Sequence, residues 1–216
     1  MNTVQVYLVD DEADVTDALV WLLESVSIRS RAFTSAQAFL AEVRRAQGPA
    51  CAVLDLRMPE MSGLELQRQL IAHGHDDIPL VFLTAHGDVP AAVNAMQAGA
   101  IDFVQKPFNP DSFLESIRRA MRLALQRHTQ RSSEVHMRRL LAHLSSREIE
   151  VLRGLLDGLT SKELGKVLGI SPKTVDVHRA NVVRKMQVGS TTELVRMLGR
   201  DLPLPPSGAP VWQQER

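Results

Sequence analysis

The sequence predicts an α/β domain with a doubly wound, parallel (βα)5 sheet over residues 1–125, followed by an all-α domain of four helices over residues 144–200. Up to about residue 125, short apolar runs alternate with stretches of helical spacing, whereas the later residues carry only helix signals. The charge also changes sign, because residues 1–120 hold 9 Lys and Arg against 16 Asp and Glu, and residues 121–216 hold 16 against 9. An acidic module joined to a basic one is expected, although uneven surface charge without any partner gives the same numbers.

Five short apolar runs are expected to form the strands, at residues 4–9, 29–33, 51–54, 80–83 and 101–104. Their nearly continuous apolar character is typical of parallel strands covered by helices on both faces. The stretches between them place apolar residues three or four positions apart, as in Leu19, Leu22, Leu23 and Val26. This alternation of strands and helices predicts the doubly wound sheet.

A long helical stretch follows the last strand, from residue 111 to about residue 144. Its first part is expected to pack on the sheet through Phe113, Ile117, Ala120, Met121 and Leu125. Residues 126–143 are rich in Arg, Gln, Ser and His and poor in large apolar residues until their end. They are therefore predicted to form an exposed linker that is helical at least in part.

The C-terminal region shows short helices with clear starts. Ser145-x-x-Glu148 and Thr160-x-x-Glu163 fit capping boxes, and Ser171 precedes a proline at a first helical position. The expected helices are residues 146–157, 161–168, 172–187 and 190–199. The expected core of this domain comprises Ile149, Val151, Leu152, Leu155, Leu164, Val167, Leu168, Ile170, Val175 and Val183. Residues 201–216 are proline-rich and expected to be disordered.

Composition excludes several classes of protein. The longest apolar run, residues 18–23, is far shorter than the ~18 residues that a membrane span needs, and acidic residues 10–12 fall where a secretory signal would be apolar. One cysteine, Cys51, excludes an intramolecular disulfide and a cysteine-built zinc site. We therefore expect no membrane association and a location in the reducing cytoplasm.

Polar residues follow the carboxyl ends of four predicted strands, where parallel sheets bind ligands. They are Asp10 and Asp11, Asp55, Thr84 and Lys106. Clustered carboxylates repel each other unless a cation is present, and Mg²⁺ prefers oxygen ligands. A carboxylate beside that ion can attack phosphorus, while a lysine and a hydroxyl stabilise the transferring oxygens. Each residue alone has a simpler explanation as a helix cap or a solvated side chain, so the argument depends on their joint arrangement.

Residues 4–125 resemble the receiver domain of bacterial two-component response regulators, which has a flavodoxin-like fold. The resemblance lies in Val-Asp-Asp-Glu at 9–12, Leu-Asp-Leu-Arg-Met-Pro at 54–59, Met-Ser-Gly at 61–63, Thr-Ala at 84–85 and Lys-Pro-Phe at 106–108. It implies that a sensor histidine kinase transfers a phosphoryl group to Asp55.

The same resemblance assigns roles around Asp55. Asp11, Asp55 and the main-chain carbonyl of Arg57 would bind Mg²⁺ or Mn²⁺, with Asp10 acting through a water molecule. The other positions would contact the phosphoryl group or respond to it: Lys106, Thr84, the small Ala85 and the switch aromatic Phe103, with a cis peptide bond before Pro107.

The helix predicted at residues 172–187 has the composition of a DNA-recognition helix. It combines cations with short hydrogen-bonding side chains and follows a compact helix and the short turn Gly169-Ile170-Ser171. A charged helix by itself is more often a solvated face, so the preceding helix and turn are what favour DNA binding.

Residues 144–200 resemble the LuxR-type helix-turn-helix domain, through Leu-Ser-x-Arg-Glu at 144–148, Gly-Leu-Thr-x-Lys-Glu-Leu at 158–164 and Ser-x-x-Thr-Val-x-Val-His at 171–178. The resemblance implies that Asp176, Val177 and Ala180 face the bases. It places the following residues near phosphates: Lys173, Thr174, His178, Arg179 and Lys185.

The whole layout is similar to the NarL/FixJ subfamily of response regulators, and its helix-turn-helix string at 171–182 is similar to the FixJ, StyR and TodT branch. The resemblance implies double-stranded promoter DNA, RNA polymerase and a second copy of the chain as partners. It places a dimer surface on Val89, Ala92, Val93 and Met96. Activation by dimerisation and activation by unmasking of the recognition helix both remain open.

Two other functions compete with a phosphorylation-activated transcription regulator, which is not an enzyme. A Mg²⁺-dependent phosphohydrolase using Asp55 is disfavoured because Arg57 stands where the common aspartate phosphatases have a second carboxylate. A module that binds only proteins is disfavoured by the helix-turn-helix string and its capping boxes.

Overall fold

The computed structural model describes residues 3–45, 48–85 and 89–199, and the predicted tail at 201–216 lies outside them. The chain divides into two compact units, Met1–Ser132 and Ser133–Arg216. In the first unit, five parallel strands form one sheet in the order β2-β1-β3-β4-β5. The strands are β1 (Gln5–Val9), β2 (Ser30–Phe33), β3 (Ala50–Leu54), β4 (Leu80–Thr84) and β5 (Asp102–Gln105). This arrangement confirms the predicted (βα)5 sheet.

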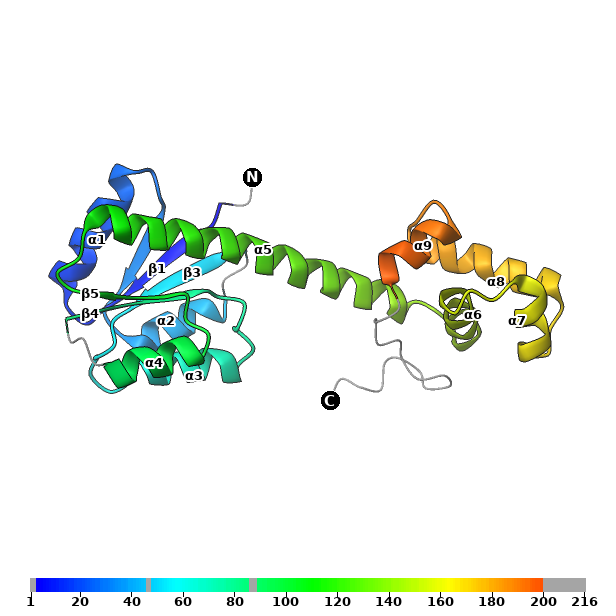
Figure 1. Ribbon diagram of the computed structural model, residues 1–216, viewed down its shortest axis with the longest axis horizontal. Coiled ribbons are helices and arrows are strands. Elements are labelled where there is room, and N and C mark those ends of the chain that lie inside the picture. The colour runs from blue at the N-terminus through cyan, green and yellow to red at the C-terminus, as the bar shows by residue number, and fades with distance from the viewer. Residues whose placement is uncertain (1–2, 46–47, 86–88, 200–216) are drawn as a thin grey trace. The chain divides into compact units, whose positions relative to one another are not determined.

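Helices cover both faces of the sheet (Figure 1). One layer contains α1 (Ala13–Ser25) and the first turns of α5 (Pro110–Ala142), which pack on Val6, Leu8 and Val53. The other layer contains α2 (Ala36–Val43), α3 (Gly63–Ala72) and α4 (Val89–Gln97). The central strands β3 and β4 are buried along their whole length, which is why their sequences are almost entirely apolar.

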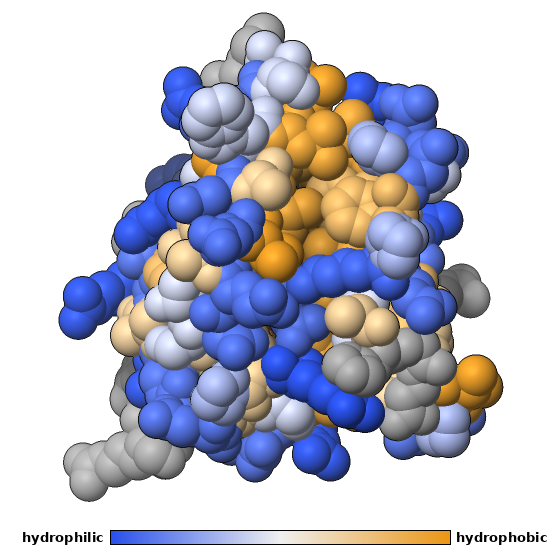
Figure 2. All heavy atoms as spheres, turned by 90° about the vertical axis from the view of Figure 1, so that its left-hand side faces the viewer, coloured by the Kyte–Doolittle hydropathy of each residue, from blue (hydrophilic) through white to orange (hydrophobic). Residues whose placement is uncertain are grey.

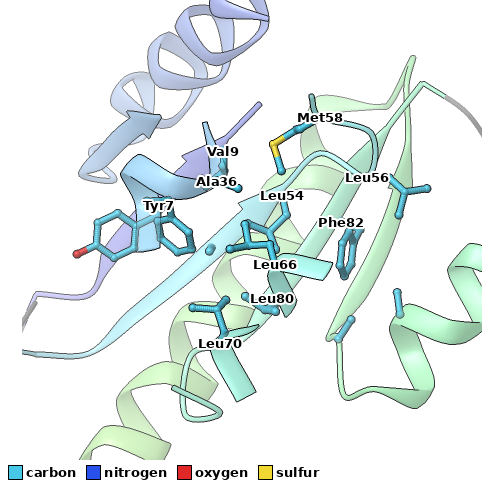
Figure 3. Close-up of a cluster of buried hydrophobic side chains, with 14 of the residues drawn as sticks. Tyr7, Val9, Ala36, Leu54, Leu56, Met58, Leu66, Leu70, Leu80 and Phe82 are labelled. Atoms are coloured by element: carbon cyan, nitrogen blue, oxygen red, sulfur yellow. The ribbon is translucent and has the colours of Figure 1, made fainter. Parts of the chain in front are cut away.

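The core beneath α2 and α3 is built from alternate residues of the central strands. Leu54 and Phe82 point toward Leu66 of α3, and Tyr7 lies at the α2 side of the same cluster (Figure 3). The Tyr7 ring packs edge-on against Phe39, with ring centroids 5.3 Å apart. This packing fixes β1 and β3 side by side, and the candidate site lies just beyond their carboxyl ends.

Helix α5 continues without a break from the first unit into the second. Its polar stretch is anchored to the loop after α3, because Arg127 Nη1 donates to the Asp76 carbonyl at 3.0 Å and Arg131 Nη1 donates to Asp77 Oδ1 at 2.6 Å. At the other end, Leu140 and Leu141 are buried in the second unit. Residues at both ends of the linker expected at 126–143 thus contact a folded unit.

Within the described part of the second unit, four helices follow α5: α6 (Ser146–Leu156), α7 (Ser161–Leu168), α8 (Pro172–Lys185) and α9 (Thr191–Leu198). Both predicted capping boxes are formed, at Ser145 with Glu148 and at Thr160 with Glu163. The α7–α8 turn uses Gly169 in the left-handed conformation, with φ of 67°. The predicted all-α domain is therefore confirmed.

Three expected core positions differ in the structure. Leu125 is exposed and Ala124 is buried in its place, so the prediction for Leu125 is wrong. Val167 is 72% exposed, which also contradicts its prediction, because the buried face of α7 is completed by Leu164 and Gly165. Val182 rather than Val183 is fully buried in α8. For Leu125 and Val183 the buried face of the helix was misjudged by one position, because each has an apolar neighbour in the sequence.

Candidate functional site

Three carboxylates meet at the carboxyl ends of β1 and β3. The register pairs Val9 with Leu54, so the residues that follow, Asp10 and Asp55, leave the sheet next to each other. The Asp55 amide continues the ladder by donating to the Val9 carbonyl at 2.8 Å. Carboxylate oxygens of Asp10, Asp11 and Asp55 lie within 4.8 Å of one another. The sheet topology thus brings together residues that are 44 positions apart in the sequence.

Asp55 is only 8% exposed at the base of this cluster. Its Oδ2 atom accepts a hydrogen bond from the Arg57 amide at 3.0 Å, which fixes the orientation of the carboxyl group. Burial, followed by the nearby charge of Asp10, raises the pKa of Asp55 above its ordinary value, against the opposing effect of Lys106. The negative charge at this position is therefore unfavourable in the pocket without a cation.

Lys106 enters the pocket from the strand β5 side. Its Nζ atom donates to Asp10 Oδ2 at 2.6 Å, and both side chains are largely buried. The Lys106 amide donates to the Thr84 carbonyl at 2.7 Å, which joins the ends of β5 and β4. The peptide bond between Lys106 and Pro107 is cis. In this structure the ammonium group thus pairs with a pocket carboxylate, close to the position expected for a phosphoryl group.

Thr84 and Phe103 lie on the neighbouring strands β4 and β5. Thr84 is buried, and Ala85 after it is exposed. Phe103 is half-buried, and its ring centroid lies 6.3 Å from that of the fully buried Phe82. Phe103 therefore connects the surface near α4 with the core under the pocket.

Gly63 is a site residue whose role the sequence alone did not reveal. A Cβ atom at this position would lie 2.2 Å from the Asp55 carbonyl oxygen and 2.9 Å from the Phe82 ring. The start of α3 can approach the Asp55 backbone only because the residue has no side chain. The glycine stands in a quoted motif, but its steric reason appears only when α3 and β3 are placed together.

The second unit presents α8 as a largely exposed helix whose core contacts are Val175 and Val182. His178 is half-buried on it, and five of the residues expected to contact DNA are exposed: Lys173, Thr174, Asp176, Val177 and Ala180. Gly165 allows the close α7–α8 turn, because a Cβ atom there would lie 2.8 Å from the Ile170 carbonyl oxygen. This arrangement supports α8 as the recognition helix of a helix-turn-helix.

Two of the expected DNA contacts, Asp176 and Arg179, are engaged inside the unit. The Ser161 hydroxyl donates to Asp176 Oδ1 at 2.6 Å. Arg179 Nη1 donates to the Ser161 hydroxyl oxygen at 3.0 Å, and Arg179 Nη2 donates to Thr191 Oγ1 at 3.2 Å. Ser161 and Thr191 begin helices α7 and α9, and no sequence motif pointed to them.

Lys185, at the last turn of α8, also has internal partners. Its Nζ atom donates to Glu148 Oε2 at 2.6 Å and to the His143 carbonyl at 3.1 Å. Burial alone would raise the pKa of Glu148, but the hydrogen bonds from Lys185 and from the Ser145 amide hold that pKa below its ordinary value. In the structure Lys185 links α8 to the start of α6 rather than standing free for a phosphate.

Known protein families match both units. The response regulator receiver domain matches residues 6–118, and the luxR family of bacterial regulatory proteins matches residues 142–198. The response regulator protein TodT of Pseudomonas putida is 43% identical over 195 residues, which cover 90% of this chain and 85% of TodT. This chain belongs to the response regulator family. It joins a receiver domain to a LuxR-type DNA-binding domain.

Two further relatives support the NarL/FixJ type of response regulator. The transcriptional regulatory protein FixJ of Rhizobium meliloti is 42% identical over 200 residues, which cover 91% of this chain and 96% of FixJ. The solved structure of the response regulator StyR is 41% identical, has a TM-score of 0.81, and covers 91% of this chain and 98% of StyR. Together with the LuxR-type domain, these relatives make this response regulator a transcription regulator.

The receiver pocket fits a hard divalent cation. Asp10, Asp11 and Asp55 offer oxygen atoms, the ligand type that Mg²⁺ prefers, at mutual distances that one ion can bridge. The raised pKa of Asp55 indicates an excess of negative charge that a cation would offset. Figure 2 shows the receiver face at the left-hand side of Figure 1, where hydrophilic side chains surround a smaller hydrophobic area.

The α4 helix of the receiver carries the residues expected in a dimer surface. Val89 is 71% exposed, Val93 and Met96 are also exposed, and Ala92 is half-buried. The helix packs on the sheet through its small residues Ala91 and Ala95. Large apolar side chains therefore lie on the solvent side of α4 and small ones on the core side.

Among the described helices, none has both the length and the apolar character that crossing a bilayer requires.

Proposed function

We propose that this response regulator is switched on by transfer of a phosphoryl group from a sensor histidine kinase to Asp55, and that it then binds promoter DNA as a dimer. The observation that supports this proposal is the convergence of Asp10, Asp11, Asp55 and Lys106 at the carboxyl ends of the strands in a receiver domain. The partner DNA of a bacterial regulator lies in the cytoplasm, which is where we place this protein.

In the proposed transfer, an Asp55 carboxylate oxygen attacks the phosphorus atom. The bond between phosphorus and a histidine nitrogen of the kinase breaks as the new phosphorus–oxygen bond forms, and the nitrogen leaves with the electron pair. The hydrogen bond from the Arg57 amide to Asp55 Oδ2 orients the attacking group. The transfer needs Asp55 as an ionised carboxylate. Because the pKa of Asp55 is raised, its ionisation depends on nearby positive charge such as that of Lys106.

Mg²⁺ or Mn²⁺ would be held by Asp11, Asp55 and the Arg57 carbonyl, with Asp10 acting through water, and would supply positive charge beside the phosphoryl oxygens. The Lys106 ammonium, now 2.6 Å from Asp10 Oδ2, would turn to a phosphoryl oxygen after transfer. The Thr84 hydroxyl would donate a hydrogen bond to another phosphoryl oxygen. The small, exposed Ala85 would leave room beside the phosphoryl group. Phe103 would follow Thr84 toward the core, because its ring lies beside Phe82.

The exposed residues of α8 form the proposed DNA surface. Val177 and Ala180, together with Asp176, would face base edges in the major groove, while Lys173, Thr174 and His178 would contact phosphates. Arg179 and Lys185 belong to the same helix, but their hydrogen bonds to Ser161 and Glu148 give them internal roles in the structure. Lys185 would have to leave Glu148 to contact a phosphate.

Dimerisation would link two recognition helices that each bind DNA weakly. When one helix binds, the other is held at a high effective concentration near the DNA, so the pair binds more tightly than one helix. The exposed Val89, Val93 and Met96, with Ala92 beside them, provide the proposed receiver dimer surface. We infer that the DNA-bound dimer then recruits RNA polymerase and activates transcription. Release of α8 from contact with the receiver is a second route to activation, which the charge difference between the two modules favours.

The test compares the wild type with Asp55→Asn in intact-mass and sedimentation experiments, in the presence of Mg²⁺ and acetyl phosphate. One added phosphoryl group and a shift to dimer are expected in the wild type and absent in Asp55→Asn. Asp17→Asn, which removes an exposed carboxylate on α1, is the matched control and should behave as the wild type.

Other outcomes separate the alternatives. Phosphorylation without dimerisation would favour unmasking of α8, and no phosphorylation by acetyl phosphate or by a cognate kinase would contradict the proposal. Continuous turnover of a generic phosphate ester would instead favour a phosphohydrolase.

A further inference from the structure

The Ser161 hydroxyl links α7 to α8, and Arg179 extends this link to α9. Its Oγ atom lies 2.6 Å from Asp176 Oδ1 and 3.0 Å from Arg179 Nη1, both on α8. Arg179 also reaches Thr191 at the start of α9, at 3.2 Å. The chain of contacts therefore runs from Asp176 through Ser161 and Arg179 to Thr191.

The donors and acceptors of this chain are matched. A serine hydroxyl has one proton to donate and can also accept, whereas a guanidinium group only donates and a carboxylate only accepts. Ser161 must therefore donate to Asp176 and accept from Arg179. The Ser161 hydroxyl thus bridges the two charged groups, and Arg179 Nη1 also forms an ion pair with Asp176 Oδ1 at 3.9 Å.

We propose that Ser161 is a positioning residue for DNA sequence recognition, because its hydroxyl fixes the orientation of the Asp176 carboxylate on the exposed face of α8. The inference rests on the proposed function, in which α8 enters the major groove. Asp176 is the acidic side chain on an otherwise basic or neutral exposed face of this helix, and a carboxylate accepts a hydrogen bond from the N4 amino group of cytosine. Ser161 thus acts on specificity without touching the DNA.

The start of α7 does not need the Ser161 hydroxyl. Thr160 is the N-cap residue, and its reciprocal hydrogen bonds with Glu163 complete the capping box. Ser161 follows it at the first helical position, where its side chain is free to reach α8. Replacing Ser161 should therefore leave the α7 cap intact while releasing Asp176 and Arg179.

The test uses the phosphorylated full-length chain and a pool of double-stranded oligonucleotides with a randomised binding region, with the bound fraction sequenced. Ser161→Ala is expected to lower the preference for cytosine opposite Asp176 by about fivefold or more, the lower range of discrimination by a well-placed side chain. Asp176→Ala should cause the same loss, and adding Ser161→Ala to it should change nothing further. Ser161→Thr, which keeps a hydroxyl, should restore the preference.

The matched control is Ser146→Ala, because Ser146 is the exposed first residue of α6 after its own capping-box residue. It should keep the wild-type preference, and thermal unfolding should show that every variant is folded. A loss of preference in Asp176→Ala but not in Ser161→Ala would overturn the inference and leave the proposed function intact. A wild type that selects no sequence would overturn the DNA-binding proposal itself, and this inference with it.

Discussion

Asp55 shows how the fold changes the protonation equilibrium of a carboxyl group. Asp55 is largely buried, and the charge of Asp10 adds to the effect of burial in raising its pKa. A raised pKa in the folded state means that the ionised form destabilises the fold at neutral pH. An ionised Asp55 is thus a charge that folding disfavours, and the proposed role of Asp55 as the phosphoryl acceptor would explain why the fold keeps it.

Asp55→Asn is expected to stabilise the receiver domain at pH 7 without Mg²⁺, by several degrees in unfolding temperature. The neutral amide removes the charge that burial and Asp10 oppose. The sign follows from the raised pKa: the gain is full above the folded-state pKa and disappears as the pH falls toward the ordinary Asp value, where both states are protonated. Thermal unfolding of both proteins between pH 4 and pH 8 (approximate limits set by the ordinary Asp range) measures it.

Mg²⁺ provides the control for that experiment. A cation bound at the carboxylates stabilises only the folded state that holds it, so the wild type should gain stability with added Mg²⁺ and Asp55→Asn should gain much less. Equal gains in the two proteins would show that the ion binds elsewhere.

Helix α8 depends on its neighbours at both ends. Its first half meets Ser161 through Asp176 and Arg179, and its last turn meets Glu148 through Lys185. Glu148 is buried and already caps α6, so Lys185 compensates a charge that would otherwise be isolated from water. Some cationic side chains of α8, such as Lys185, thus bind partners inside the domain, while others, such as Lys173, are exposed and available to DNA.

Lys185→Met is expected to lower the free energy of unfolding of the DNA-binding domain by about 1–3 kcal/mol, because Glu148 loses its charged partner. The lowered pKa of Glu148 gives the sign of the pH effect: its stabilisation is present above the ordinary Glu pKa and is lost as the pH falls through the lower folded-state value. Denaturant unfolding at two pH values measures both effects.

The same variant tests whether Lys185 contacts DNA. The salt dependence of DNA affinity should stay at the wild-type slope if Lys185 is internal, and should fall by about one unit if it neutralises a phosphate. Lys173→Met, which removes an exposed cation of the first turn of α8, is the comparison expected to reduce the slope.

Helices α6 and α7 meet at Gly154. A Cβ atom there would lie 2.3 Å from Cδ2 of the buried Leu164, so Gly154→Ala should destabilise the domain by about 1–3 kcal/mol through overpacking. The check is a double-mutant cycle by denaturant unfolding, in which Leu164→Ala makes room for the new methyl group. Additive effects of the two substitutions would argue against this contact.

At the scale of the whole molecule, the proposed function requires the receiver to pass its phosphorylation state to a second compact unit. Two features of the receiver are suited to this. Phe103 connects the core at Phe82 with the surface beside α4, and α4 carries the exposed apolar residues Val89, Val93 and Met96. Helix α5 then continues directly from the receiver into the second unit.

Phe103→Ala is expected to leave phosphorylation of Asp55 intact while weakening dimerisation of the phosphorylated protein by about tenfold or more, the loss that follows from roughly 1.4 kcal/mol. Phe103 carries no polar group that could take part in the transfer, but its ring packs against Phe82 beneath α4. Intact mass gives the extent of phosphorylation, and sedimentation gives the dimer constant. Wild-type dimerisation in Phe103→Ala would show that the ring is no part of the coupling.

The sequence by itself determined the fold class, the approximate bounds of the strands and helices, and the family. These follow from local chemistry: apolar strands of a covered parallel sheet, Ser and Thr caps with Glu three residues later, and motifs at the ends of strands. The same signals placed Asp10, Asp11, Asp55, Thr84 and Lys106 at the end of a predicted strand or just beyond it.

The tertiary structure decided what depends on contacts between distant residues. Val167 and Leu125 satisfied the helical spacing, yet the neighbouring helices and strands lie on the other side of each helix, so both are exposed. Ser161 and Glu148 carry no signal for their partners on α8, because those partners are 15 and 37 positions away. Periodicity shows that a helix has a buried face, but only the packed neighbours decide which residues lie on it and which cations remain for DNA.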